Sequence, residues 1–123
     1  MLDTLRKTGG LVELHRHLDG SLRSQTLNEM AHAMDLRVPK DLIFWANMGL
    51  EAALARFDFT LSVLQGTAAV ARVASEICED ARAEGIDHLE IRFAPQLHKG
   101  ADMASIVDAA LEGVGQNAGL ILC

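Results

Sequence analysis

The sequence has only two cysteines, no long apolar run and fewer basic than acidic residues. Cys78 lies in a segment of helical periodicity and Cys123 is the last residue, so they match no metal-binding or redox motif. A reduced, cytoplasmic protein is therefore expected. No stretch of about 18 apolar residues is present, so we expect no membrane span. Residues 1–10 also lack the apolar core of a signal peptide.

The charge balance is acidic, with 11 Lys and Arg against 17 Asp and Glu and a formal net charge of -6 at pH 7. This balance argues against nucleic-acid binding, which requires a basic surface. Hydrophobic residues make up 50% of the chain, enough for a sizeable core. Because no repeat, low-complexity segment or linker is visible, we expect residues 1–123 to form part or all of one domain.

The most informative stretch is residues 11–20, LVELHRHLDG. Its alternating apolar residues predict a strand, in which successive side chains point to opposite faces. Ionisable side chains are expected on one face: Glu13, His15, His17 and Asp19. Apolar side chains are expected on the other face: Val12, Leu14 and Leu18. Arg16 is the exception on that face, and we expect its side chain to reach solvent between helices.

Four ionisable groups on one strand face are costly in a core but suit a metal site. Two imidazoles two residues apart on a strand can hold one cation, and neutral imidazole is a common zinc ligand. Gly20 then allows a sharp turn. We therefore predict that His15 and His17 bind metal, the alternative being a half-solvated strand without a ligand.

Helical periodicity and turn residues predict the helices. The expected N-caps are Ser24, Asp41, Thr67 and Asp102. The expected helical ranges are 24–35, 42–47, 50–64, 67–85 and 102–119.

Two further strands are expected, at 88–93 and from Leu120 onward. The resulting order of strand, helices, strand, helix, strand is typical of parallel βα units. Glu90 and Arg92 share one face of the second strand. We expect them to form a buried ion pair with neighbouring residues or with Glu13, a direct role in substrate binding being the alternative.

Two motifs resemble the adenosine deaminase family of the amidohydrolase superfamily. Residues 12–20, VELHRHLDG, followed by SLR, resemble the family's opening strand, and residues 87–95, DHLEIRFAP, resemble its second barrel strand. Order and spacing also fit, so the resemblance extends from Leu11 to Cys123. A bare His-x-His also suits other amidohydrolases and phosphoesterases of the histidinol-phosphatase kind, but the second motif favours the deaminases.

The resemblance implies an α/β fold, the N-terminal part of a (β/α)8 TIM-type barrel with extra helices between strands one and two. A complete barrel needs roughly 250 residues. We therefore expect the chain to be truncated at strand three.

The resemblance also implies the function: zinc-dependent hydrolytic deamination of adenosine or deoxyadenosine to inosine or deoxyinosine and ammonia. It makes His15 and His17 ligands of one Zn2+. The implied contacts to the partner, a small-molecule purine nucleoside, come from four residues: His17, Asp19, Leu54 and Phe57. Adenine-specific relatives usually carry Glu in place of Asp19, which favours a nucleoside.

The family's remaining zinc ligands and acid–base residues are expected beyond Cys123, because no His-Ala-Gly-Glu-like segment or late paired aspartates occur here. His32, His88 and His98 match none of those positions, so surface or packing roles are expected for them. We expect the isolated chain to bind zinc weakly and to deaminate nothing. The alternatives are a deaminase of another aminopurine such as adenine, or a non-catalytic remnant or binding module.

Overall fold

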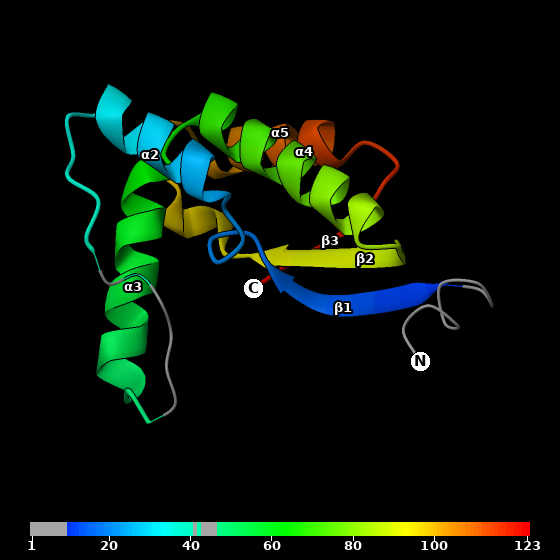
Figure 1. Ribbon diagram of the computed structural model, residues 1–123. Helices are drawn as coiled ribbons and strands as arrows, with labels where there is room; N and C mark the ends of the chain where they lie inside the picture. Colours follow the sequence, from blue (N-terminus) through cyan, green and yellow to red (C-terminus); the bar gives the residue numbers. More distant parts are fainter. Residues whose placement is uncertain (1–9, 41, 43–46) are drawn as a thin grey trace.

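The computed structural model describes residues 10–40, 42 and 47–123 (Figure 1). The predicted short helix over 42–47 and its cap Asp41 fall almost wholly outside these residues. No helix in the described ranges is both long and apolar enough to cross a bilayer. The elements run in this order: β1 (Leu11–His17), α2 (Ser24–Ala33), α3 (Leu50–Val63), α4 (Thr67–Ala83), β2 (Ile86–Phe93), the 3-10 helix η1 (Pro95–Leu97), α5 (Met103–Val114) and β3 (Gly119–Leu122).

The strands form one parallel sheet in the order β1-β2-β3. Helices α4 and α5 lie along the same face of this sheet, while α3 extends away from it (Figure 1). Among the described residues no helix covers the opposite face, which we call the open face. This is the architecture of βα units in a barrel, seen as an open segment.

The core lies between the sheet and its two covering helices. The apolar positions of α4 recur at helical spacing and are buried against alternate residues of β2, because each element has one apolar face. The core includes Val70, Val73, Ala74, Ile77, Ala81, Leu89, Ile91, Phe93, Ile106, Ala110 and Val114. The predicted apolar stripe of the 67–85 helix is therefore confirmed.

β1 contains a bulge that changes which of its residues share a face. The register shifts between Glu13, which pairs with Leu89, and Arg16, which pairs with Ile91. The two pairs are three residues apart in β1 but only two residues apart in β2. Glu13 and Arg16 therefore both lie toward the helices, with Arg16 Nε donating to Glu13 Oε1 at 2.8 Å and Nη2 reaching Glu84 Oε2 at 3.4 Å. The predicted shared face of Glu13 with His15 and His17 is wrong, because a one-residue slip moves every preceding side chain to the other face.

The same slip reverses the apolar residues that precede it. Val12 and Leu14, predicted on the core face, are 61% and 52% exposed. Leu18 follows the bulge and is fully buried in the core, as predicted. The alternating pattern of the sequence thus predicts the faces correctly only on the carboxyl side of the bulge.

The helix starts agree only in part with the predicted caps. Asp102 caps α5, accepting a hydrogen bond from the Ser105 backbone N–H at 2.9 Å, as predicted. Ser24 and Thr67 are instead the first helical residues, and neither preceding residue makes a side-chain cap. The chain enters α4 through Gly66, whose φ of +83° suits glycine.

Candidate metal and substrate site

The two predicted metal ligands come together at the carboxyl end of β1. The Nε2 atoms of His15 and His17 lie 3.1 Å apart, and their ring centroids lie 4.9 Å apart. Both side chains are exposed. Zinc–imidazole bonds measure about 2.0–2.1 Å, so one ion can reach both nitrogens.

The pair fits a metal but is incomplete as a metal site. Among the described residues no group of three or more His, Cys, Asp or Glu side chains is placed to hold an ion. Functional zinc sites use at least three protein ligands. The described part of the chain therefore offers two converging imidazole donors without a third protein ligand beside them.

Hydrogen bonds fix the end of β1 that carries the second histidine. The hydroxyl of Ser21 donates to the His17 carbonyl at 2.6 Å, and the Leu18 N–H donates to the Arg92 carbonyl at 3.1 Å. The turn that follows fits tightly: a Cβ added at Gly20 would lie only 3.0 Å from Phe57 Cε1. The sharp turn expected at this glycine is thus packed directly beneath an aromatic ring of α3.

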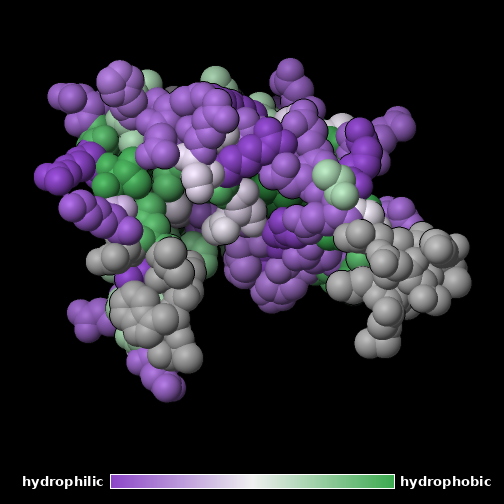
Figure 2. All heavy atoms as spheres, in the orientation of Figure 1, coloured by the Kyte–Doolittle hydropathy of each residue, from purple (hydrophilic) through white to green (hydrophobic). Residues whose placement is uncertain are grey.

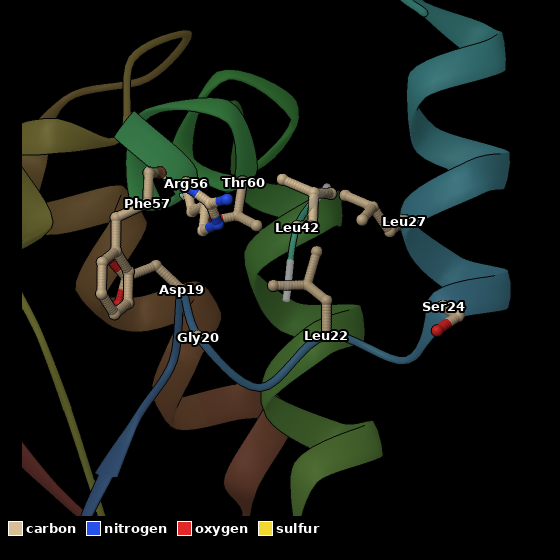
Figure 3. Close-up of a pocket in the computed structure, with 9 residues that line it drawn as sticks. All are labelled: Asp19, Gly20, Leu22, Ser24, Leu27, Leu42, Arg56, Phe57 and Thr60. Atoms are coloured by element: carbon tan, nitrogen blue, oxygen red, sulfur yellow. Dashed lines mark hydrogen bonds between the residues drawn. The ribbon is translucent and has the colours of Figure 1, made fainter. Parts of the chain in front are cut away.

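A cavity of about 220 Å³ opens beside this turn, between α2 and α3. Hydrophobic side chains gather at the junction of these helices (Figure 2). Figure 3 shows Phe57 beside Asp19, with Arg56 and Thr60 of the same helix facing Leu42. The lining residues are Asp19, Gly20, Leu22, Ser24, Leu27, Leu42, Arg56, Phe57 and Thr60. A carboxylate, a guanidinium and two hydroxyls on apolar walls suit a small ligand with both polar and apolar faces.

Of the predicted substrate residues, some line the cavity and one does not. Asp19 is half-buried and lines the cavity, as does Phe57. The ring of Phe57 also lies 6.2 Å, centroid to centroid, from that of His17, which connects the cavity to the histidine pair. Leu54 is 52% exposed and is not among the lining residues.

The sequence did not predict a place in a ligand site for three polar lining residues, Ser24, Arg56 and Thr60. A signal for two of them was present in the helical period. Thr60 lies three residues after Phe57, a spacing that puts both on one helix face. Arg56 lies four residues before Thr60, a spacing that also makes the two neighbours on the helix surface. Its Nη1 donates to the Ala52 carbonyl at 2.8 Å.

Glu90 and Arg92 share the open face of β2 but do not form the predicted buried ion pair. The partly exposed Glu90 carboxylate lies 3.5 Å from the exposed His88 imidazole. Arg92 Nη2 donates to the Leu14 carbonyl at 3.4 Å. Pairing with Glu13 fails because the bulge turns that carboxylate toward Arg16, whose hydrogen bond lowers the pKa of Glu13.

The remaining histidines have the surface and packing roles that we expected. His98 is 3% exposed, its Nδ1 lies 2.8 Å from the Leu64 carbonyl oxygen, and its ring packs edge-on against Phe93. His32 and His88 are exposed.

An ionic clamp anchors the chain just after the cavity turn. Arg23 Nε donates to both carboxylate oxygens of Asp80 at 3.1 Å, and its Nη2 donates to Glu79 Oε2 at 2.9 Å. The hydrogen bonding from Arg23 to Asp80 lowers the pKa of the Asp80 carboxyl. The clamp joins the start of α2 to α4 and so restrains the segment that carries Asp19.

Comparison with known proteins identifies a family whose members are similar to this chain. The family model described as adenosine deaminase matches residues 10–119. A probable adenosine deaminase of Dictyostelium discoideum is 42% identical over 113 aligned positions, covering 83% of this chain and 15% of that protein. The adenosine deaminase of Shewanella woodyi is 34% identical over 114 positions, covering 84% of this chain and 34% of that protein. The chain thus spans about a third or less of the length of these relatives.

Solved structures show the same fold. An amidohydrolase from Burkholderia ambifaria with bound Zn matches with a TM-score of 0.76 and 19% identity, covering 98% of this chain and 37% of that one. An N6-mAMP deaminase from Arabidopsis matches with a TM-score of 0.74 and 23% identity, covering 98% and 42%. The predicted fold, the N-terminal part of a TIM-type barrel, is therefore confirmed.

Proposed function

Because the chain belongs to the adenosine deaminase family, we propose that it forms the opening part of a zinc-dependent purine deaminase. The reaction is hydrolytic: water replaces the amino group of adenosine or deoxyadenosine, giving inosine or deoxyinosine and ammonia. The observation that carries this proposal is the 3.1 Å separation of the His15 and His17 Nε2 atoms at the carboxyl end of β1. Carboxyl ends of the strands are where active sites of such barrels lie.

The histidine pair is the proposed contribution of this chain to the metal site. Both side chains are exposed, and their Nε2 atoms converge to 3.1 Å, as donors to one ion must. Zinc, when bound, lowers the pKa of a coordinated water toward neutrality. We assign the remaining ligands and the acid–base residues to barrel strands outside these 123 residues, which we take as one partial barrel domain.

Asp19 is the proposed contact to the sugar of the nucleoside. Its carboxylate lines the cavity two residues after His17, and an ionised carboxylate accepts hydrogen bonds from hydroxyl groups. The proposed role of His17 is double, because its ring contacts both His15 and the Phe57 side of the cavity. A sugar contact from Asp19 favours a nucleoside over a free base.

Phe57 is the proposed apolar wall that shields the bound purine from water. It packs on Gly20 and faces the ring of His17, so it stands between the cavity and the metal pair. Leu54 lies one turn earlier on α3, more exposed, and we place it at the outer rim of the same wall.

The thiols of Cys78 and Cys123 are both unpaired, which suits the reducing cytoplasm where we place the protein.

A substrate panel tests this function on the product of the complete coding sequence. Ammonia release is measured with adenosine, deoxyadenosine, adenine and AMP, before and after removal and return of zinc. We expect release from the two nucleosides, loss with a chelator and recovery with zinc. Release from adenine alone would identify an aminopurine deaminase of the alternative kind, and no release from any substrate would indicate a non-catalytic protein.

The isolated 123-residue chain provides the matched control. We expect it to bind zinc weakly and to release no ammonia, because it holds two imidazole donors and none of the later acid–base residues. Stoichiometric zinc and turnover by this short chain would contradict the proposed division of the site.

A further inference from the structure

We propose, building on the metal role proposed for the histidine pair, that Arg92 is a positioning residue for His15 and His17. Its guanidinium holds the β1 bulge in the shape that turns both imidazoles to the open face. It acts through the main chain of β1.

The bulge creates the need for such a residue. Leu14 and His15 together stand opposite a single β2 residue, Glu90, because the register resumes at Arg16. A bulge interrupts the hydrogen-bond ladder and re-aims the side chains beside it. Without a restraint, the segment can return to regular pairing, which would move the side chains before Arg16 to the opposite face.

Arg92 supplies a restraint on each side of the pair. Its Nη2 donates to the Leu14 carbonyl at 3.4 Å, just before His15. Its own carbonyl accepts the Leu18 N–H at 3.1 Å, just after His17, with which it is in register. One residue of β2 therefore brackets the segment that carries both imidazoles.

The Nε atom of Arg92 gives a second, independent observation. This nitrogen is buried, and it has no hydrogen-bond partner among the described residues. Buried unpaired donors are rare in native proteins and call for an explanation. The guanidinium is held on the open face, with one donor unsatisfied, while its terminal nitrogen reaches the bulge.

This arrangement determines which substitutions are informative. Arg92→Met retains an apolar stem but has no donor for the Leu14 carbonyl. Arg92→Lys retains a terminal donor and has no Nε to leave unpaired. Arg82→Met is the matched control, because Arg82 Nη2 donates to Asn117 Oδ1 at 2.7 Å, away from the histidine pair.

The experiment is nuclear magnetic resonance on the 123-residue chain and these variants. The ring-to-ring NOE between His15 and His17 is measured without metal, and both rings are then followed while zinc is added. In the wild type and Arg82→Met we expect the NOE and a joint shift of both rings. In Arg92→Met we expect loss of the NOE and about tenfold weaker zinc binding, with partial recovery in Arg92→Lys.

The outcomes separate the positioning role from the metal role. A full NOE and unchanged zinc affinity in Arg92→Met would overturn the positioning role. Loss of the NOE in Arg92→Met would support the positioning role. If, in addition, the two wild-type rings did not respond together to zinc, that result would contradict the proposed function. If Arg92→Met does not fold, Arg92→Gln makes the same comparison, because the glutamine side chain is too short for its amide to reach the Leu14 carbonyl.

Discussion

At the residue scale, the proposed metal role depends on two imidazoles acting as one chelating pair. Replacing His17 by alanine removes one donor and leaves a single imidazole, so we expect zinc bound by the full gene product to fall at least tenfold. His32→Ala is the control, because His32 is exposed on α2. Metal analysis after dialysis makes the comparison, and equal zinc in both variants would contradict the role of His17.

Phe57 and Leu54 test how far the proposed purine site extends along α3. Phe57→Ala removes the ring that packs on Gly20 and faces His17, so we expect weaker binding of the nucleoside and a higher KM. Leu54→Ala removes a side chain that is 52% exposed, so we expect a much smaller change in KM. An equal rise in KM for both would contradict the placement of Leu54 at the outer rim of the wall.

Residue identity predicted part of this site. Two histidines two residues apart, followed by Asp19 and Gly20, predicted a polar cluster at a strand end, and the structure brings these residues together. Arg23 and Arg92 were not predicted as restraints. Their partners lie far away in the chain, at Asp80 and Leu14, and no local spacing in the sequence indicates such contacts.

At the element scale, the join between α2 and α4 depends on the charge of Asp80. Arg23 holds the pKa of this carboxyl below its ordinary value of about 3.9. The clamp therefore contributes stability above that ordinary pKa, and the contribution is lost as pH falls through the lowered folded-state value. Glu29, whose pKa is lowered chiefly by Arg72, acts in the same direction.

Arg23→Met tests this pH dependence. We expect its destabilisation relative to the wild type to be full near pH 7 and to shrink as pH falls below about 4. Urea unfolding followed by circular dichroism at several pH values measures the difference. Arg37→Met, at an exposed position, is the control, and a pH-independent difference for Arg23→Met would contradict the clamp.

The contact between α4 and α5 depends on the absence of a side chain at Gly113. A Cβ there would lie 2.4 Å from the Ala71 carbonyl oxygen and 2.8 Å from Ala74 Cβ. We expect Gly113→Ala to lower the free energy of unfolding by about 1–3 kcal/mol, despite the better helix propensity of alanine. Glu112→Ala, on the exposed side of α5, should change it by less than about 0.5 kcal/mol.

Helices α4 and α5 were predictable from periodicity because each has one apolar face against the sheet. The faces of β1 were not fully predictable. A bulge is a property of two paired strands, and the β1 sequence alone contains no residue that marks it. The alternation therefore failed for Val12, Leu14 and Glu13 and held for Leu18.

At the scale of the whole molecule, the sheet has an uncovered face and two free edges within the described residues. Val12 and Leu14 are exposed on that face. Unpaired strand edges and exposed apolar side chains favour association. We expect the isolated chain to show a mass that rises with concentration in light scattering, whereas a stable monomer at all concentrations would contradict this expectation.

The most direct test of the central claim is ammonia release from adenosine by the full gene product, compared with its His15→Ala/His17→Ala variant. Zinc content is recorded on the same samples. We expect about one zinc per chain and steady ammonia release from the wild type, and neither from the variant. Undiminished release by the variant, or a wild type that holds zinc without releasing ammonia, would contradict a purine deaminase site built on this histidine pair.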